Sequence, residues 1–285
     1  MPGSRNRRFL MLLAITLAGL TTRALPQNPE QSSPPAEAEK DSSRKRVKAK
    51  DSIVVGAHLT PEEIEDGKIN DAYQPLYHLT QPNDCPQIVK LCETQIIPMA
   101  EKSKFEVTRN KYLFLANREM ASCEMASGAY EEAERRYQKL FDYIEIWPGK
   151  DDSDYPLNYR AIGSARIMQQ KWKEAEKSLE MSIAIFDQQI DGAAHADSEF
   201  MRHEHSKNLK MSQAQARNYL AIACFRDDRQ AEAMGMLEKA YQEAIDSSAT
   251  PQMIQKIIDS GRAASAALGD TTEKAKWDAR TPSSK

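Results

Sequence analysis

Apolar residues recur at helical spacing from about residue 105 onward, and charged residues fill the positions between them. Short polar breaks divide this pattern into pairs of helices. The first clear pair is predicted over residues 107–126 and 131–146. Further pairs are predicted over residues 157–185, 213–245 and 251–279. Because every element predicted in this region is a helix, we expect an all-α fold.

An alanine recurs in the second helix of each predicted pair. These alanines are Ala133, Ala175, Ala233 and Ala275, with gaps of 42, 58 and 42 residues. Twelve residues before each alanine lies a small residue: Ala121, Gly163, Ala221 and Ala263. Antiparallel helices approach closely where the side chains between them are small. The spacing therefore predicts a repeated helical hairpin, and such hairpins bury their apolar faces by stacking on one another.

A further, degenerate pair of helices is predicted over residues 53–104. Thr60, Pro61 and Glu63 form a helix start, with a capping hydroxyl, a proline at the first helical position and a carboxylate where a capping box requires one. This helix is expected to run to about residue 79 with a disturbance at Pro75, and the second to begin near residue 86. Residues 105–280 then form the repeat domain, and residues 281–285 a disordered tail.

The first two clear pairs carry a recognisable set of residues. These are Ala121, Gly128, Tyr130, Ala133 and Tyr137 in the first pair, and Gly163, Trp172, Ala175 and Leu179 in the second. In this respect the chain resembles the tetratricopeptide repeat, although Gln230 and Thr272 replace the turn aromatic in the last two pairs. The resemblance implies an α-solenoid of stacked antiparallel helix hairpins, a TPR-like superhelix. It also implies a concave surface, lined by the first helix of each pair, that holds segments of partner proteins.

The repeat spacing locates polar residues that would line this concave groove. Arg118, Arg160 and Asn218 lie fifteen residues before a repeat alanine, and Ser122 and Ser164 lie eleven residues before one. Arginine offers a fork of donors that suits carboxylates. We therefore expect a protein or peptide partner that is acidic or ends in a free C-terminal carboxylate. The alternative is that both arginines pair with acidic residues of neighbouring helices.

The first residues are typical of a secretory signal peptide. Three arginines among the first eight residues precede an apolar run over residues 9–20, and Ala24 offers a small-residue cleavage site. We expect a signal peptide over residues 1–24, a disordered linker rich in proline, serine and charge over residues 25–52, and export to the periplasm or beyond the cell. The alternative is an uncleaved segment that anchors the protein in the inner membrane, although a spanning helix needs roughly 20 apolar residues.

The four cysteines allow one pairing that the predicted helices bring together. Cys85 and Cys123 each lie nineteen residues from a predicted turn near Lys104, so they share one level of a hairpin. Export implies an oxidising compartment in which a disulfide persists, and this is the pair that we expect to form one. The alternative is that all four cysteines, including Cys92 and Cys224, are small buried hydrophobes.

The middle gap between the repeat alanines exceeds the other two by 58 − 42 = 16 residues, and the excess falls within residues 187–208. This insertion contains His195, His203, His205, Asp197, Glu199 and Glu204. These residue types bind metals, but a spacing of two puts His203 and His205 on different faces of a helix. We expect no metal site here, and the role of the insertion stays open.

The remaining patterns argue against several classes of protein. A net charge of −3 offers no concentrated basic face for nucleic acid. Phosphate-binding glycine loops and nucleophile or metalloprotease motifs are missing from the sequence, so we expect neither an enzyme nor a cofactor. We interpret the chain as a non-catalytic protein–protein interaction scaffold of a bacterial cell envelope. The alternatives are a self-assembling structural subunit of an envelope complex and a helical enzyme whose site the sequence does not reveal.

Overall fold

The computed structural model describes residues 59–195 and 201–282, which form helices and, within these ranges, no strand. The N-terminal part consists of α2 (Pro61–Tyr73), the 3-10 helix η2 (Gln74–His78), α3 (Cys85–Leu91), the π-helical η3 (Cys92–Ile96) and α4 (Ile97–Glu101). Four helix pairs follow: α5 (Glu106–Ser127) with α6 (Tyr130–Ile144), α7 (Asp154–Met168) with α8 (Trp172–Ala194), α9 (Ser206–Arg226) with α10 (Gln230–Asp246), and α11 (Pro251–Leu268) with α12 (Thr271–Asp278).

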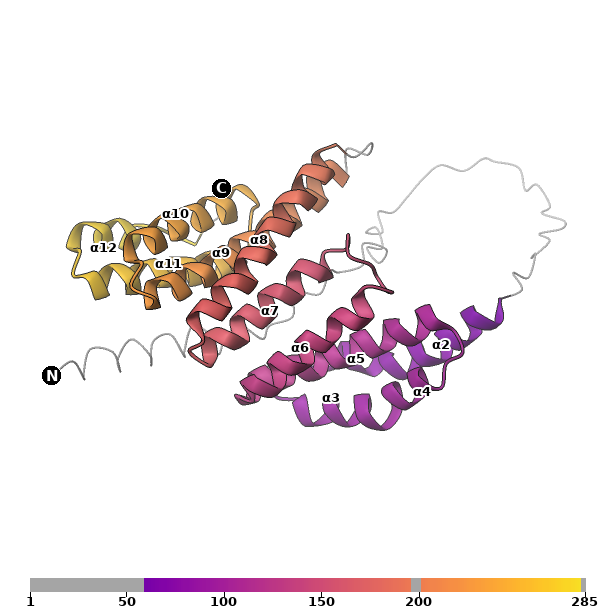
Figure 1. The fold of residues 1–285 in the computed structure, drawn as a ribbon. Helices are drawn as coiled ribbons and strands as arrows, with labels where there is room; N and C mark the ends of the chain where they lie inside the picture. The colour runs from indigo at the N-terminus through magenta and orange to yellow at the C-terminus, as the bar shows by residue number, and fades with distance from the viewer. Residues whose placement is uncertain (1–58, 196–200, 283–285) are drawn as a thin grey trace, which may run out of the picture.

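The helices form an elongated stack in which, from α5 onward, each helix packs against the next one in the sequence (Figure 1). In addition, α7 contacts α9 and α9 contacts α11, so the first helices of successive pairs lie beside one another. The predicted all-α solenoid of stacked hairpins is confirmed. The predicted signal peptide and linker lie outside the described residues. Among the helices that the structure describes, none is long and apolar enough to cross a membrane.

The first helix begins as its sequence predicts. The Thr60 hydroxyl accepts a hydrogen bond from the Glu63 amide at 3.2 Å, and the Glu63 carboxylate accepts one from the Thr60 amide at 2.7 Å. This reciprocal pair satisfies two amides that the helix itself leaves without partners. Helix α2 ends at Tyr73 and continues as the 3-10 helix η2, which contains Pro75 at the predicted disturbance.

The three best-defined hairpins cross where the sequence places small residues. Ala133, Ala175 and Ala233 are completely buried. On the first helix of the second hairpin, a Cβ added to Gly163 would lie 2.6 Å from the Leu179 Cγ atom of the facing helix. Only glycine therefore fits at this position. Each hairpin turns at a residue of positive φ, seven positions after the small residue of its first helix (Ala121, Gly163 or Ala221). These turn residues are Gly128, Gln170 and Asp228.

The fourth hairpin corrects the predicted register. Ala275 is exposed, and a Cβ on Gly261 would collide with the Trp277 indole. Gly261 and Trp277 are sixteen residues apart, as are Gly163 and Leu179, so the true crossing lies two residues before the predicted one. The prediction was wrong because Gly269 turns the chain one residue earlier than the repeat spacing places the turn, and because it follows its crossing glycine by eight residues rather than seven. Trp277 is the bulky residue at this crossing, as Leu179 is in the second hairpin.

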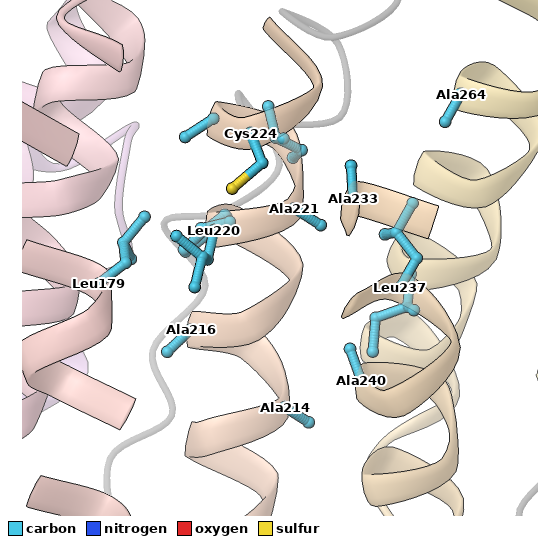
Figure 2. Packing of buried hydrophobic residues seen from close by; sticks show 14 of the residues in the cluster. Leu179, Ala214, Ala216, Leu220, Ala221, Cys224, Ala233, Leu237, Ala240 and Ala264 are labelled. Carbon is cyan, nitrogen blue, oxygen red and sulfur yellow. The ribbon is translucent and has the colours of Figure 1, made fainter. Parts of the chain in front are cut away.

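The largest apolar cluster lies around α9, and its alanines are packed between larger side chains (Figure 2). Residues 216–224 of this helix are all buried, because α7, α8, α10 and α11 surround it. Leu179 approaches from α8, and Leu237 and Ala264 from α10 and α11. Small side chains on α9 therefore allow several helices to meet at one place, which a helix of bulky residues would not.

Each of the first three junctions between successive pairs has a specific cross-link. Cys85 of α3 and Cys123 of α5 form a disulfide with their Cα atoms 5.3 Å apart, while Cys92 and Cys224 are buried free thiols. At the second junction, Glu134 of α6 accepts from Arg166 at 2.6 Å and pairs with Lys171 at 3.2 Å.

The third junction repeats the second in the next pair. Glu176 and Arg229 pair at 2.5 Å, and they occupy the same repeat positions as Glu134 and Lys171. Since Glu134 and Glu176 are both largely buried, these links fix how far one hairpin is rotated on the next. The sequence did not reveal them, because their partners come from different repeats.

The insertion lengthens two neighbouring helices that belong to different hairpins, α8 and α9. Helix α8 continues to Ala194, and the π-helical η4 (Met201–His205) leads directly into α9. Phe186, Ala193 and Leu209 form a small apolar cluster between these extended helices. His195 and His203 are exposed, whereas Asp197 and Glu199 lie outside the described residues. In the part of the chain that the structure describes, no group of three metal-binding side chains comes together.

Two glycine substitutions test the helix crossings. Gly163→Ala should destabilise the fold by about 1–3 kcal/mol, because the new methyl group overpacks against Leu179. Gly235→Ala is the matched control: a Cβ there meets nothing within 4 Å, and alanine should stabilise α10 by about 0.5–1 kcal/mol. Urea unfolding monitored by circular dichroism measures both. Equal stability of the two variants would contradict the assigned crossing.

Candidate binding face

The inner face of α7 carries a cation without an acidic partner. Arg160 is half-buried, and burial lowers the pKa of its guanidinium. The groups that interact with it electrostatically are the phenols of Tyr219, on α9, and Tyr137, on α6. No carboxylate of the described residues forms an ion pair with Arg160, and its guanidinium makes no hydrogen bond to them. The charge is therefore partly desolvated and lacks the compensation that such a group ordinarily has.

Arg118, at the matched position one repeat earlier, is in a different state. Its Nη1 atom lies 3.1 Å and 3.3 Å from the two carboxylate oxygens of Asp154, at the start of α7. Its guanidinium also lies over the Phe114 ring, 5.2 Å from the centroid. Burial raises the pKa of the Asp154 carboxyl, and Arg118 opposes that rise. For this arginine, pairing with an acidic neighbour is what the structure shows.

Hydroxyl groups flank both arginines. The Ser122 hydroxyl donates to the Arg118 carbonyl at 3.0 Å and lies 3.4 Å from the Tyr137 hydroxyl. Burial raises the pKa of Tyr137 to about 12, so its phenol is neutral at physiological pH. Ser122 on α5 is thereby connected to the phenol that stands beside Arg160.

A second group of polar side chains comes from α9. Burial raises the pKa of Tyr219 to about 12, and its hydroxyl interacts with Arg160, Gln215 and Ser164. Asn218 precedes it and is buried, and its Oδ1 atom accepts no hydrogen bond from the described residues. Because this atom is itself shielded from solvent, a ligand from outside the chain does not reach it in this structure. The face thus offers a cation and the neutral hydroxyls of two phenols.

The structure thus brings together part of the predicted groove set. Arg160 and Ser164 both interact with Tyr219. Arg118 instead pairs with Asp154, and the Ser122 hydroxyl donates to the Arg118 carbonyl. The repeat spacing did not single out Tyr137 and Tyr219 as site residues. Tyr137 lies four residues after the repeat alanine Ala133, on the second helix of its pair. Its hydroxyl could have been anticipated at the inner face, because buried phenols usually reach a polar partner.

These observations define a class of protein: an all-α solenoid of stacked antiparallel helix hairpins. Residues 112–188 match the sequence model of the tetratricopeptide repeat family. The match covers most of α5, all of α6 and α7, and most of α8. These two hairpins are thus similar to tetratricopeptide repeats, a type of unit that generally mediates protein–protein interaction. A search of curated proteins finds no match to the chain.

The different states of the two arginines predict different effects on stability. Arg118→Met leaves the largely buried Asp154 carboxylate without its cation and should cost about 1–3 kcal/mol. Arg160→Met keeps the aliphatic stem, removes an uncompensated charge, and should leave stability unchanged or raise it. Thermal and urea unfolding of the two variants make the comparison. An equal loss in Arg160→Met would show that Arg160 serves the fold rather than a ligand.

Proposed function

We propose that this protein is a non-catalytic scaffold whose inner face binds a segment of a partner protein. The tetratricopeptide repeats support protein binding as the general role. The observation that carries the finer proposal is Arg160, a half-buried guanidinium with no acidic partner among the described residues. A carboxylate from the partner supplies the missing charge, either as an acidic side chain or as a free C-terminus.

The groups around Arg160 suit such a ligand. A guanidinium binds a carboxylate through two parallel hydrogen bonds, and the neutral phenols of Tyr137 and Tyr219 can donate to the same anion. Arg118 contributes less, because a ligand would have to compete with Asp154 for it.

Affinity capture tests this proposal. The wild-type protein is immobilised on a resin and incubated with an extract of its native cells. It should retain a partner that mass spectrometry identifies. Arg160→Met should weaken binding of the synthesised partner segment roughly 10- to 100-fold, as expected for loss of a charged hydrogen bond. Lys177→Met is the control, because it removes an exposed cation from the outer helix α8.

Two comparisons complete that experiment. Amidation of the segment's C-terminus distinguishes a terminal carboxylate from an acidic side chain as the group that binds. Equal affinity of the wild type, Arg160→Met and Lys177→Met for the segment would contradict a role for Arg160 in binding.

We also propose that the protein acts outside the cytoplasm, in the periplasm or beyond the cell. The arginine-flanked apolar run at the N-terminus supports export, and the Cys85–Cys123 disulfide suits an oxidising compartment. An inner-membrane anchor through the N-terminal segment is the alternative.

One mass spectrum of protein expressed in its native host tests both features of this localisation. The mature chain should begin at Leu25. Alkylation under denaturing conditions should modify two cysteines before reduction, namely Cys92 and Cys224, and four after it. A chain that retains its first residues would contradict cleavage, and four alkylated cysteines without reductant would contradict the disulfide.

Self-assembly by end-to-end stacking has less support. The end helices carry exposed charged residues, among them Glu62, Glu63 and Lys68 on α2 and Lys274 and Lys276 on α12. Another hairpin stacked on either end would have to desolvate such groups. These ends are typical of capping units, which close a solenoid and keep it soluble.

A further inference from the structure

Helix α7 has a second exposed face that the proposed binding role does not use. Arg166 on this face donates to Glu134 of α6 at 2.6 Å and to Ser178 of α8 at 2.7 Å. It therefore lies between the two outer helices. Tyr159 and Tyr155 precede it by seven and eleven residues, which puts them on the same side of the helix.

Three aromatic rings meet on this outer face. The centroid of Phe141 lies 4.6 Å from that of Tyr159 and 5.1 Å from that of Tyr155. The two tyrosine centroids are 5.6 Å apart. All three side chains are half-buried, so part of each remains open to solvent. We call Phe141, Tyr155 and Tyr159 the outer aromatic cluster.

The repeat architecture does not require aromatic rings at this place. Asn117 and Arg217 occupy the position of Tyr159 in the preceding and following pairs. Asn117 accepts from Arg136 at 2.9 Å, and Arg217 pairs with Glu243 at 3.0 Å, so each ties its helix to the outer helix of its own pair. Phe141 and Tyr155 also pack against the apolar core, but stacking of the hairpins leaves part of each of the three rings exposed. The two tyrosines have no aromatic counterparts at their positions in the neighbouring pairs.

We propose that the outer aromatic cluster binds the chain's own proline-rich segment, residues 26–35. This segment reads PQNPEQSSPP, with prolines at 26, 29, 34 and 35. Segments of this composition favour the polyproline II helix, which docks on surfaces lined by aromatic rings. The docked segment covers the exposed parts of the rings, and its prolines lose little conformational entropy on binding.

The length of the chain permits this contact within one molecule. Between Pro35 and the first described residue, Leu59, there are 59 − 35 = 24 residue steps. Such a tether extends to at most about 80 Å, at about 3.3 Å per residue. A tether of this kind gives the segment an effective concentration on the order of millimolar, so a weak contact is populated.

The charges near the cluster agree with this occupant. Lys150 is exposed and interacts electrostatically with both Tyr155 and Tyr159. Its ion pair with Glu145, at 2.8 Å, is also exposed and can be exchanged at little cost. Glu30 directly follows Pro29 and supplies a carboxylate next to the first pair of prolines.

Photo-crosslinking in the full chain tests the proposal. Replacement of Tyr159 by p-benzoylphenylalanine should yield, on irradiation, a link to the tryptic peptide that ends at Lys40. Alanine at all four prolines of the segment should reduce the yield of that link at least fivefold. Tyr155→p-benzoylphenylalanine is a second probe in case the first variant fails to fold, as judged by circular dichroism. The probe at Leu268, which is exposed on α11, is the control and should not give this link.

The outcomes are decisive in both directions. A link to the peptide ending at Lys40, within one copy and dependent on the prolines, supports the proposal. No such link from either tyrosine position, or a yield unaffected by loss of the prolines, overturns it. A mixture of isotopically light and heavy protein shows where the link forms, and a light-to-heavy link would assign the face to a second copy and overturn the contact within one chain. None of these results depends on Arg160.

Discussion

Close approach of helix backbones at a few side-chain-poor positions is the constraint on which the structure depends. Leu179 fits against α7 only because residue 163 is glycine, and Trp277 fits against α11 only because residue 261 is glycine. Each contact fixes how a first helix is rotated against its second helix. It thereby decides which side chains of α7 face inward and which lie between the outer helices. Arg160 and Arg166, six residues apart, consequently have different surroundings.

The same constraint explains why two arginines at one repeat position differ. Arg118 meets a carboxylate at the start of the following first helix, whereas Arg160 meets the phenols of Tyr137 and Tyr219. An ion pair compensates the desolvation of Arg118, and nothing of comparable charge compensates that of Arg160 among the described residues. An uncompensated, half-buried cation is unfavourable for folding alone. This uncompensated charge is the observation on which the proposed binding role rests.

The sequence predicted the repeated hairpins well, because alanine spacing and turn residues are local signals. It misplaced the last crossing by two residues, since neither the extra residue before Gly269 nor the earlier position of this turn leaves a mark in the alanine pattern. It selected Arg118, Ser122, Arg160, Ser164 and Asn218 from spacing, but spacing cannot show that Asp154, 36 residues further along, reaches Arg118. The ion pairs of Glu134 and Glu176 could not be predicted for the same reason. Contacts between repeats depend on how one hairpin is rotated relative to the next.

The central claim is that Arg160 supplies charge to a carboxylate of a partner. A double-mutant cycle tests it most directly, by combining Arg160→Met with removal of the carboxylate from the captured segment and measuring the four dissociation constants by calorimetry. The account predicts that the two changes are strongly non-additive, with a coupling free energy of about 1.5–3 kcal/mol. Additive effects within about 0.3 kcal/mol would show that the two groups do not meet, and would contradict it.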